Sequence, residues 1–351
     1  MKTIVPAYLN DAKDKLVILD QTLLPVEEKF LELDTREDIW EAIKKLRVRG
    51  APAIGIAAAF GMYVCANKID ATDVASFKKE VKELKDYFAT SRPTAVNLFW
   101  ALDKMFNRFE KEEKAGKSVA EIKTAFLEES EAILVEDQEM GLAIGKYGLE
   151  LLKPGMGLLT HCNAGGLACS GIGTALAPMY AGQDAGYDFK IYSDETRPLL
   201  QGSRLTTYEL YKAGLDVTVI CDNMASIVMR QGKIDAVLVG TDRITANGDV
   251  INKIGTSGVA ILAKEYGIPF YVLGPYSTID MNTATGDEVE IELRESDEIG
   301  NGFGRRTAPE GAKAYNPAFD ITENKYVTAI ITEKGIVRAP YKENLAKLFK
   351  E

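Results

Sequence analysis

The chain has 351 residues, of which 46% are hydrophobic and 27% charged, a composition typical of a globular protein with a large buried core. Its formal net charge of −10 argues against nucleic acid as a main partner, because a phosphate backbone requires a basic surface. The four cysteines lack zinc-like spacing and only one histidine is present, so we expect reduced thiols and no metal.

The beginning of the chain, MKTIVPAYLNDAKDK, has no apolar run of the signal-peptide type. The longest apolar stretch, residues 53–66, is too short to cross a bilayer and is typical of a buried helix. We therefore expect a soluble, cytoplasmic protein that does not contact membranes.

The N-terminal half combines a few strands with helices. Residues 16–34 alternate short apolar runs with turn signals, which predicts two or three antiparallel strands. The segment 36–48, REDIWEAIKKLRV, has apolar residues at helical spacing, and helical patterns continue through 97–116. We place a smaller strand-plus-helix domain at residues 1–130.

The C-terminal half repeats the order strand, turn, helix. Apolar runs predict strands at 155–162, 189–195, 215–223, 234–242, 268–275 and 326–335. Helical patterns between the earlier strands lie at 171–183, 197–214, 224–232 and 249–267. This alternation indicates right-handed βαβ units and a parallel sheet. We therefore expect an α/β protein in which residues 131–351 form a Rossmann-like domain.

Three polar side chains fall at the ends of predicted strands. Cys162 ends the first strand of this half, Asp194 ends the second, and Asp242 ends the fourth. Ligands of open parallel sheets bind at the carboxyl ends of the strands. The pattern therefore predicts a site at this edge of the sheet.

The only histidine, His161, directly precedes Cys162. Adjacent strand residues point to opposite faces, which argues against a Cys–His nucleophilic pair and against a metal site. We expect His161 to be hydrogen-bonded beneath the sheet edge. Cys162 is either a small apolar filler or a functional thiol. The following NAGG lets a ligand approach the backbone, and a helix starting nearby would favour the thiolate.

A second glycine feature, RVRGAPAIGIAAAFG, occupies residues 47–61. Pro52 suits the first turn of a helix, which places Arg49, Gly50 and Ala51 at a helix N-terminus, a favourable anion site. A tightly packed helix of small residues with a surface arginine is the alternative. Arg92 precedes a proline in the same way. No Walker or complete GxGxxG motif supports a nucleotide cofactor.

Five stretches resemble methylthioribose-1-phosphate isomerases, in the same order along residues 17–340: VRGAPAIGIAAA, THCNAGGLA, DETRPLLQGSRLT, GTDRITANGDVINKIGT and APEGAKAYNPAFD. That family is related to archaeal ribose-1,5-bisphosphate isomerases and to regulatory subunits of a translation initiation exchange factor. The resemblance implies the two-domain fold described above, a homodimer, no cofactor or metal, and a role in methionine salvage.

The resemblance also assigns residues to a site. It implies that Cys162 and Asp242 are the catalytic pair. It implies that a sugar-phosphate substrate is held by Arg49, Gly50, Ala51, Arg92, Gln201, Asn252 and Lys253.

The implied reaction converts an aldose 1-phosphate to a ketose 1-phosphate. The phosphate locks the anomeric carbon, so ring opening needs a proton at the ring oxygen and isomerisation needs net movement of hydrogen from C2 to C1. One acid and one base suffice. Asp242 as the acid would have to stay protonated near neutral pH, which requires a dry pocket, and Cys162 would be the base. A direct hydride shift is the alternative.

Three other functions stay open. Departures from the family pattern at Gly166, Thr241 and 300–311 keep 5-deoxyribose 1-phosphate, or another 5-substituted ribose 1-phosphate, as an alternative substrate. A non-catalytic regulatory subunit is a second possibility, against which the presence of both Cys162 and Asp242 argues. A dehydrogenase using NAD is suggested by the fold pattern alone.

Overall fold

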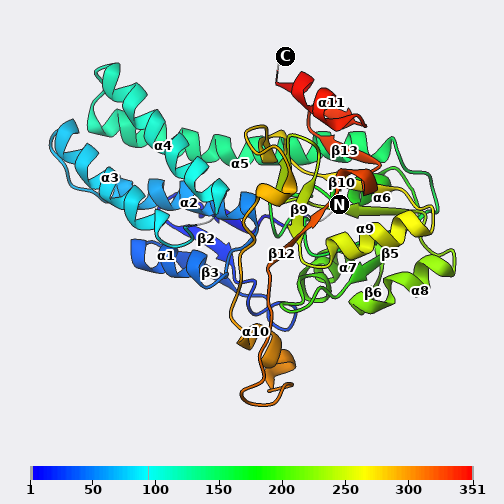
Figure 1. Cartoon of the computed structure of the whole chain (residues 1–351). Coiled ribbons are helices and arrows are strands. Elements are labelled where there is room, and N and C mark those ends of the chain that lie inside the picture. Colours follow the sequence, from blue (N-terminus) through cyan, green and yellow to red (C-terminus); the bar gives the residue numbers. More distant parts are fainter. Residues whose placement is uncertain (1–2, 94, 350–351) are drawn as a thin grey trace. The chain divides into compact units, whose positions relative to one another are not determined.

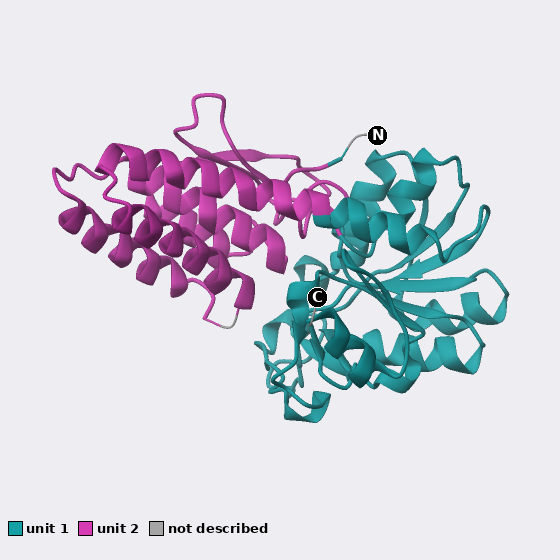
Figure 2. Cartoon of the chain, turned by 90° about the horizontal axis from the view of Figure 1, so that it is seen from above, with its two compact units in different colours: residues 1–3, 140–165, 174–351 teal, residues 4–139, 166–173 magenta. Residues whose placement is uncertain are grey.

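The computed structural model describes residues 3–93 and 95–349, and within them the chain forms two compact units (Figure 2). Unit 1 contains Met140–Gly165 and Thr174–Glu351 together with Met1–Thr3, and unit 2 contains Ile4–Glu139 and Gly166–Gly173. The chain passes from unit 2 to unit 1 inside one long helix, α5 (Val119–Leu149). The boundary at residue 130 that we placed from the sequence also falls within this helix.

Unit 2 is a helical layer with a small sheet. Its described residues include an antiparallel sheet of β1 (Ala7–Leu9), β2 (Leu16–Leu19) and β3 (Phe30–Leu33), which confirms the strands expected at 16–34. The sheet is followed by helices α1 (Arg36–Lys44), α2 (Ala51–Asn67), α3 (Val74–Ala89), α4 (Val96–Lys114) and the first part of α5 (Figure 1).

Helix α2 is the centre of unit 2. Its apolar residues surround the whole helix, which is typical of a fully buried helix. It packs against α1, α3, α4 and the sheet. Helices α1 and α3 each begin at a side-chain cap: Thr35 accepts a hydrogen bond from the N–H of Asp38, and Asp73 accepts one from the N–H of Ser76. The apolar core of the unit surrounds α2.

Unit 1 is built on a parallel sheet, which confirms the Rossmann-like prediction. Within the described residues the strand order is β14-β13-β10-β7-β4-β5-β6, and every pairing is parallel except that of β13 with β14. The strands are β4 (Gly157–Thr160), β5 (Lys190–Asp194), β6 (Asp216–Ile220), β7 (Ala236–Val239), β10 (Phe270–Leu273), β13 (Ala329–Thr332) and β14 (Gly335–Val337).

Helices pack on this sheet (Figure 1). Helix α7 contacts β6, and helix α9 contacts β7 and β10. The helices of unit 1 after α5 are α6 (Ala177–Asp184), α7 (Thr207–Lys212), α8 (Ala225–Arg230), α9 (Thr256–Glu265), α10 (Asp297–Gly300) and α11 (Tyr341–Leu348). No helix in the described ranges is both long and apolar enough to span a bilayer.

Three predicted helices of unit 1 are partly wrong. Of the helix expected at 197–214, residues 197–200 form a turn in which Leu200 has a left-handed φ of 58°, and α7 is the α-helical part. The helix expected at 171–183 begins only at Ala177, because Gly171 and Gly173 adopt positive φ angles of 67° and 72° that a right-handed helix cannot contain. The helix expected at 249–267 begins at Thr256, after a strand, β9 (Val250–Lys253).

Strand β9 belongs to a second sheet that we did not predict. In the described chain this sheet has the order β11-β8-β9-β12, formed by β11 (Ile279–Asp280), β8 (Arg243–Thr245), β9 and β12 (Phe319–Thr322). Strand β12 pairs with β9 across a long separation in sequence, which no local pattern reveals. This sheet follows β7 directly and carries two of the candidate site residues.

The segment 166–173 leaves the sheet domain and joins unit 2. The N–H of Ala53, in the first turn of α2, donates to the carbonyl of Ala168 at 3.1 Å. The side-chain amide of Gln21 donates to the carbonyl of Leu167 at 2.8 Å. These bonds fix the start of α2 against the segment.

A buried carboxyl, Asp137 of α5, lies against the same segment beside Ser170. Burial raises the pKa of Asp137 to about 7, although Ser170 partly offsets the effect. The folded state therefore favours the protonated form, and the stability that this preference provides is present below pH 4 and lost as the pH rises through about 7.

We expect the Asp137→Asn variant to lack this dependence. Between about pH 4 and 8, the unfolding free energy of the wild type should fall by about 4 kcal/mol relative to that of the variant. Urea denaturation at several pH values measures the difference, and parallel stability curves for the two proteins would contradict the assignment.

Candidate functional site

The site lies where the winding of the parallel sheet reverses. The first strand of the sheet, β4, has β5 and then β6 on one side and β7 on the other. The chain therefore winds in one direction after β4 and in the opposite direction after β7. Open α/β sheets bind ligands at such a switch point, beyond the carboxyl ends of the strands.

Cys162 and Asp242 follow the two strands that flank this switch point. Strands β4 and β7 pair in parallel with Leu159 opposite Val237, so the loops that follow them leave the same edge of the sheet. The two loops touch, because a Cβ atom at Gly240 would lie only 2.6 Å from the Cβ atom of Ala164. The structure thus brings together the loops that carry the two predicted catalytic residues.

The two side chains differ in exposure. Cys162 is buried, with 9% of its surface exposed, whereas Asp242 is exposed. The backbone N–H of Asp242 donates to the carbonyl of Ile251 in β9 at 3.0 Å, which ties its loop to the second sheet. The dry surroundings that a protonated Asp242 requires would have to come from bound substrate.

The backbone of Cys162 is held on both sides. Its φ angle is 65°, in the left-handed region. Its N–H donates to the hydroxyl of Thr196 at 2.8 Å, and its carbonyl accepts from the hydroxyl of Thr206 at 2.6 Å. The helix expected to begin close to Cys162 begins at Ala177, after a long loop, so we withdraw its dipole as a support for the thiolate.

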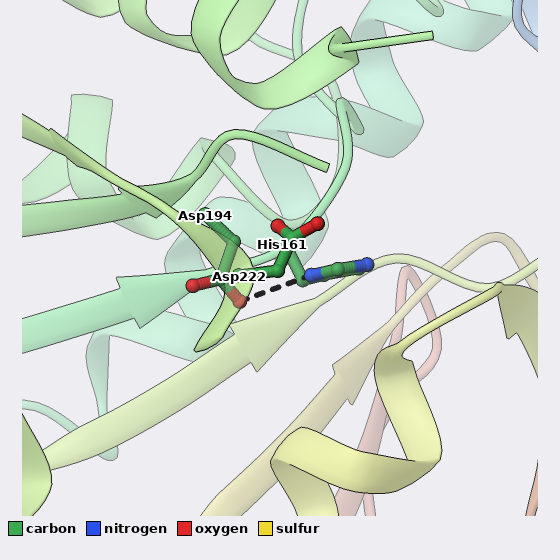
Figure 3. Close-up of side chains that lie close together, drawn as sticks. All are labelled: His161, Asp194 and Asp222. Atoms are coloured by element: carbon green, nitrogen blue, oxygen red, sulfur yellow. Dashed lines mark hydrogen bonds and ion pairs between the residues drawn. The ribbon is translucent and has the colours of Figure 1, made fainter. Parts of the chain in front are cut away.

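His161 is hydrogen-bonded beneath the sheet edge, as we expected. Its Nδ1 lies 3.0 Å from Oδ2 of Asp194 (Figure 3). Its Nε2 lies 2.9 Å from the carbonyl oxygen of Ile254. Burial lowers the pKa of His161, but the hydrogen bond and charge of Asp194 outweigh it, so the pKa is raised. For the carboxyl of Asp194, burial has the opposite effect and raises the pKa. The two residues share a buried proton.

A third polar residue, Asp222, completes this cluster. One ring nitrogen of His161 and one carboxylate oxygen each of Asp194 and Asp222 lie within 4.8 Å of one another. The three residues line a hollow of about 330 Å³ next to α9. The potential metal-binding atoms of this cluster are already hydrogen-bonded. Both ring nitrogens of His161 have partners. The carboxylate of Asp222 accepts from the backbone N–H groups of Thr196 and Arg197, both at 2.7 Å. We interpret it as structural.

Gln201 and Lys253 line one small cleft of unit 1, together with Arg294. Gln201 is buried, and its Oε1 has no hydrogen-bond partner among the described residues. The ammonium of Lys253 donates to the carbonyl of Ala318 at 3.0 Å. A buried amide oxygen without a partner and a buried ammonium are the groups that a polar ligand would engage.

Asn252 precedes Lys253 on β9, so the two side chains leave opposite faces of the strand. The amide of Asn252 donates to the hydroxyl of Thr256 at 3.1 Å, at the start of α9. The side chains of Asn252 and Lys253 therefore have different surroundings.

The remaining predicted residues belong to unit 2. Gly50 is the N-cap of α2 with a φ of 93°, and Ala51 is its first residue, as the sequence indicated. A Cβ at position 50 would lie 2.4 Å from Cα of Ala168, so only glycine fits. Arg49 precedes this cap, and Arg92 follows α3; both are half-buried.

The polar residues that support Cys162 were not predicted. Thr196 lies in DETRP and Thr206 in GSRLT, both within segments that drew attention for other residues. Nothing local in the sequence marks a hydroxyl that binds a backbone elsewhere in the chain.

Comparison with known proteins identifies the family of the chain. Residues 47–339 match the model of the initiation factor 2 subunit family. The chain belongs to that family. The 5-deoxyribose 1-phosphate isomerase of Petrotoga mobilis is 72% identical over 347 residues, which are 99% of each chain. This similarity confirms the resemblance to sugar-phosphate isomerases found in the sequence.

Two solved structures share the fold of this chain. A crystal structure of 5-methylthioribose 1-phosphate isomerase from Pyrococcus horikoshii has a TM-score of 0.95 at 42% identity and covers 100% of this chain and 97% of its own. The translation initiation factor eIF-2B subunit delta from A. fulgidus has a TM-score of 0.91 at 42% identity and covers 99% of this chain and 100% of its own.

The shared proton gives a stability prediction. Asp194→Asn removes the charged partner of buried His161, and we expect the unfolding free energy at pH 7 to fall by about 3–5 kcal/mol. Asp188→Asn is the matched control, because Asp188 forms an ion pair with Lys190 on the surface, and its loss should cost less than about 1 kcal/mol. Equal urea midpoints for the two variants would show that no buried charge is held there.

Proposed function

We propose that this protein is an aldose–ketose isomerase that converts 5-methylthioribose 1-phosphate to 5-methylthioribulose 1-phosphate. One observation carries the proposal: Cys162 and Asp242, a potential base and acid, follow neighbouring parallel strands at the switch point of the sheet. The names of the similar proteins, 5-deoxyribose 1-phosphate isomerase and 5-methylthioribose 1-phosphate isomerase, support the reaction class.

The proposed roles follow from the chemistry of an aldose 1-phosphate. Asp242 donates a proton to the ring oxygen as the bond from that oxygen to C1 breaks. Cys162 removes the proton from C2 and returns it at C1, while Asp242, now a carboxylate, accepts the proton of the C2 hydroxyl as that oxygen becomes the carbonyl. Because Asp242 is exposed in the structure, substrate must exclude water from its carboxyl before it can act as an acid. In a hydride shift, Cys162 would only steer the intermediate.

We further propose the residues that bind the substrate. In unit 1, Gln201 has an unpartnered buried oxygen and Lys253 a buried ammonium in the same cleft. In unit 2, Arg49 and the backbone of Gly50 and Ala51 at the start of α2 are proposed for the phosphate, although the N–H of Ala53 in the same turn is already bonded to the carbonyl of Ala168. The proposed binding residues are Arg49, Gly50, Ala51, Arg92, Gln201, Asn252 and Lys253. The proposal includes a homodimer, which the family resemblance implies, and a cytoplasmic location, which the scattered cysteines and the lack of a long apolar segment favour.

The same isomerisation of 5-deoxyribose 1-phosphate is the second candidate, and the Petrotoga mobilis relative favours it. The deciding experiment supplies both sugar phosphates in competition, without added metal or nucleotide, and compares kcat/KM for each. The larger value identifies the substrate. A failure to form ketose phosphate from either sugar would contradict the proposal and favour the non-catalytic alternative; one similar structure is a translation initiation factor eIF-2B subunit delta.

The catalytic pair can be tested directly. Cys162→Ser and Asp242→Asn should each lower kcat at least about 10³-fold, because each removes one proton-transferring group. Cys221→Ser, at a cysteine that follows β6 at a different point of the same sheet, is the control and should retain turnover. Near-normal steady-state kinetics in either active-site variant would rule out the assigned role.

The proposed role of Arg92 has its own test. Arg92→Ala should raise KM about tenfold and lower kcat less, because a phosphate contact is made in the ground state and the transition state alike. Arg36→Ala removes an arginine that pairs with Glu37 on the surface of the same unit, and it should leave both constants unchanged. A variant in which kcat falls while KM stays constant would place Arg92 in the chemical step instead.

A further inference from the structure

We propose that Thr196 is a positioning residue for Cys162, acting through its hydroxyl on the backbone that sets the direction of the thiol. The proposal deepens the proposed function, on which it rests, since Cys162 is the base of that reaction. It is carried by hydrogen bonds within unit 1 and by the backbone conformation of the residues involved.

Cys162 adopts a conformation that must be held from outside. A φ of 65° is uncommon for a residue with a side chain, because Cβ then crowds the backbone. The surrounding structure has to over-determine such a residue. For Cys162 it does so through both backbone polar groups, the N–H bound by Thr196 and the carbonyl bound by Thr206.

The hydroxyl of Thr196 has one defined orientation. It accepts from the N–H of Cys162 at 2.8 Å and donates to the carbonyl of Asp194 at 3.0 Å, so both its donor and its acceptor function are used. The side chain is fully buried, which leaves no water to substitute for either bond.

Thr196 is itself held in place. Its φ angle is 64°, an unusual value for a β-branched residue. One carboxylate oxygen of Asp222 accepts from the N–H of Thr196 and the other accepts from the N–H of Arg197, both at 2.7 Å. The carboxylate thus fixes the turn after β5, and the turn presents the hydroxyl to Cys162.

The second hydroxyl is fixed as firmly. Thr206 is fully buried, donates to the carbonyl of Cys162 at 2.6 Å and accepts from the side-chain amide of Asn163 at 3.1 Å. The same amide donates to the buried carboxylate of Glu209 at 2.5 Å. Two hydroxyls from the turn after β5 and the segment before α7 therefore clamp one residue after β4.

The test compares variants that change only the hydroxyl. Thr196→Val keeps the shape but removes the oxygen, and Thr196→Ser keeps the oxygen. The matched control is Thr332→Val, because the hydroxyl of Thr332 is also buried and also accepts a backbone N–H, that of Lys334 at 3.1 Å, but in the β13–β14 hairpin. Thr206→Val probes the other side of the clamp.

Two readouts are measured on the full chain, together with the thermal midpoint. The first is kcat and KM. The second is the rate at which iodoacetamide alkylates Cys162, followed by peptide mass mapping to separate it from Cys65, Cys169 and Cys221. The alkylation rate needs no sugar substrate, so it tests the clamp even where the proposed reaction fails.

We expect Thr196→Val to lower kcat about tenfold or more with KM within about twofold, and to raise the alkylation rate of Cys162 severalfold as the thiol is released. Thr196→Ser keeps the hydroxyl, so its kcat and its Cys162 alkylation rate should stay close to those of the wild type. Thr332→Val should change neither quantity. The proposal would be overturned if Cys162 in Thr196→Val were alkylated at the wild-type rate. It would also be overturned if Thr332→Val changed kcat and the alkylation rate as much as Thr196→Val does. Should Thr196→Val not fold, the same two readouts on Thr206→Val decide.

Discussion

The parallel pairing of β4 with β7 is the constraint on which the site depends. This pairing makes neighbours of two loops that lie far apart in the sequence, and it directs both to the carboxyl edge of the sheet. The close contact at Gly240 and Ala164 is possible only without a side chain at position 240. A shift in this register, or any Cβ at that glycine, would separate the loops that carry Cys162 and Asp242, the proposed base and acid.

The polar residues beneath this edge satisfy one another instead of water. His161 shares a proton with Asp194, Asp222 receives the N–H groups of the following turn, and the hydroxyl of Thr196 links that turn to Cys162. Buried polar groups are costly when unpaired, so such a network admits few alternative arrangements. Two non-glycine residues with positive φ, Cys162 and Thr196, persist because the network holds them.

Much of the fold was predictable because buried parallel strands are continuous apolar runs bounded by turns. The strands that became β4, β5 and β7 were found in this way, and so was the N-terminus of α2 at Ala51. The segment 249–267 was misassigned because Val250–Lys253 is a strand only through its pairing with β8 and β12. That pairing depends on residues far along the chain, and no local period records it.

The sequence by itself determined the α/β class and the strands at or after whose ends Cys162, Asp194 and Asp242 lie. These depend on hydrophobic periodicity, which is a local property. The alternation of side chains along a strand does not decide the directions of His161 and Cys162, because β4 ends at Thr160 and Cys162 has a left-handed φ of 65°. Only the tertiary structure decided that Thr196 and Thr206 hold the backbone of Cys162 and that β9 pairs within a second sheet. The reason is physical: these contacts join groups from different elements, and their distances exist only after the chain has packed.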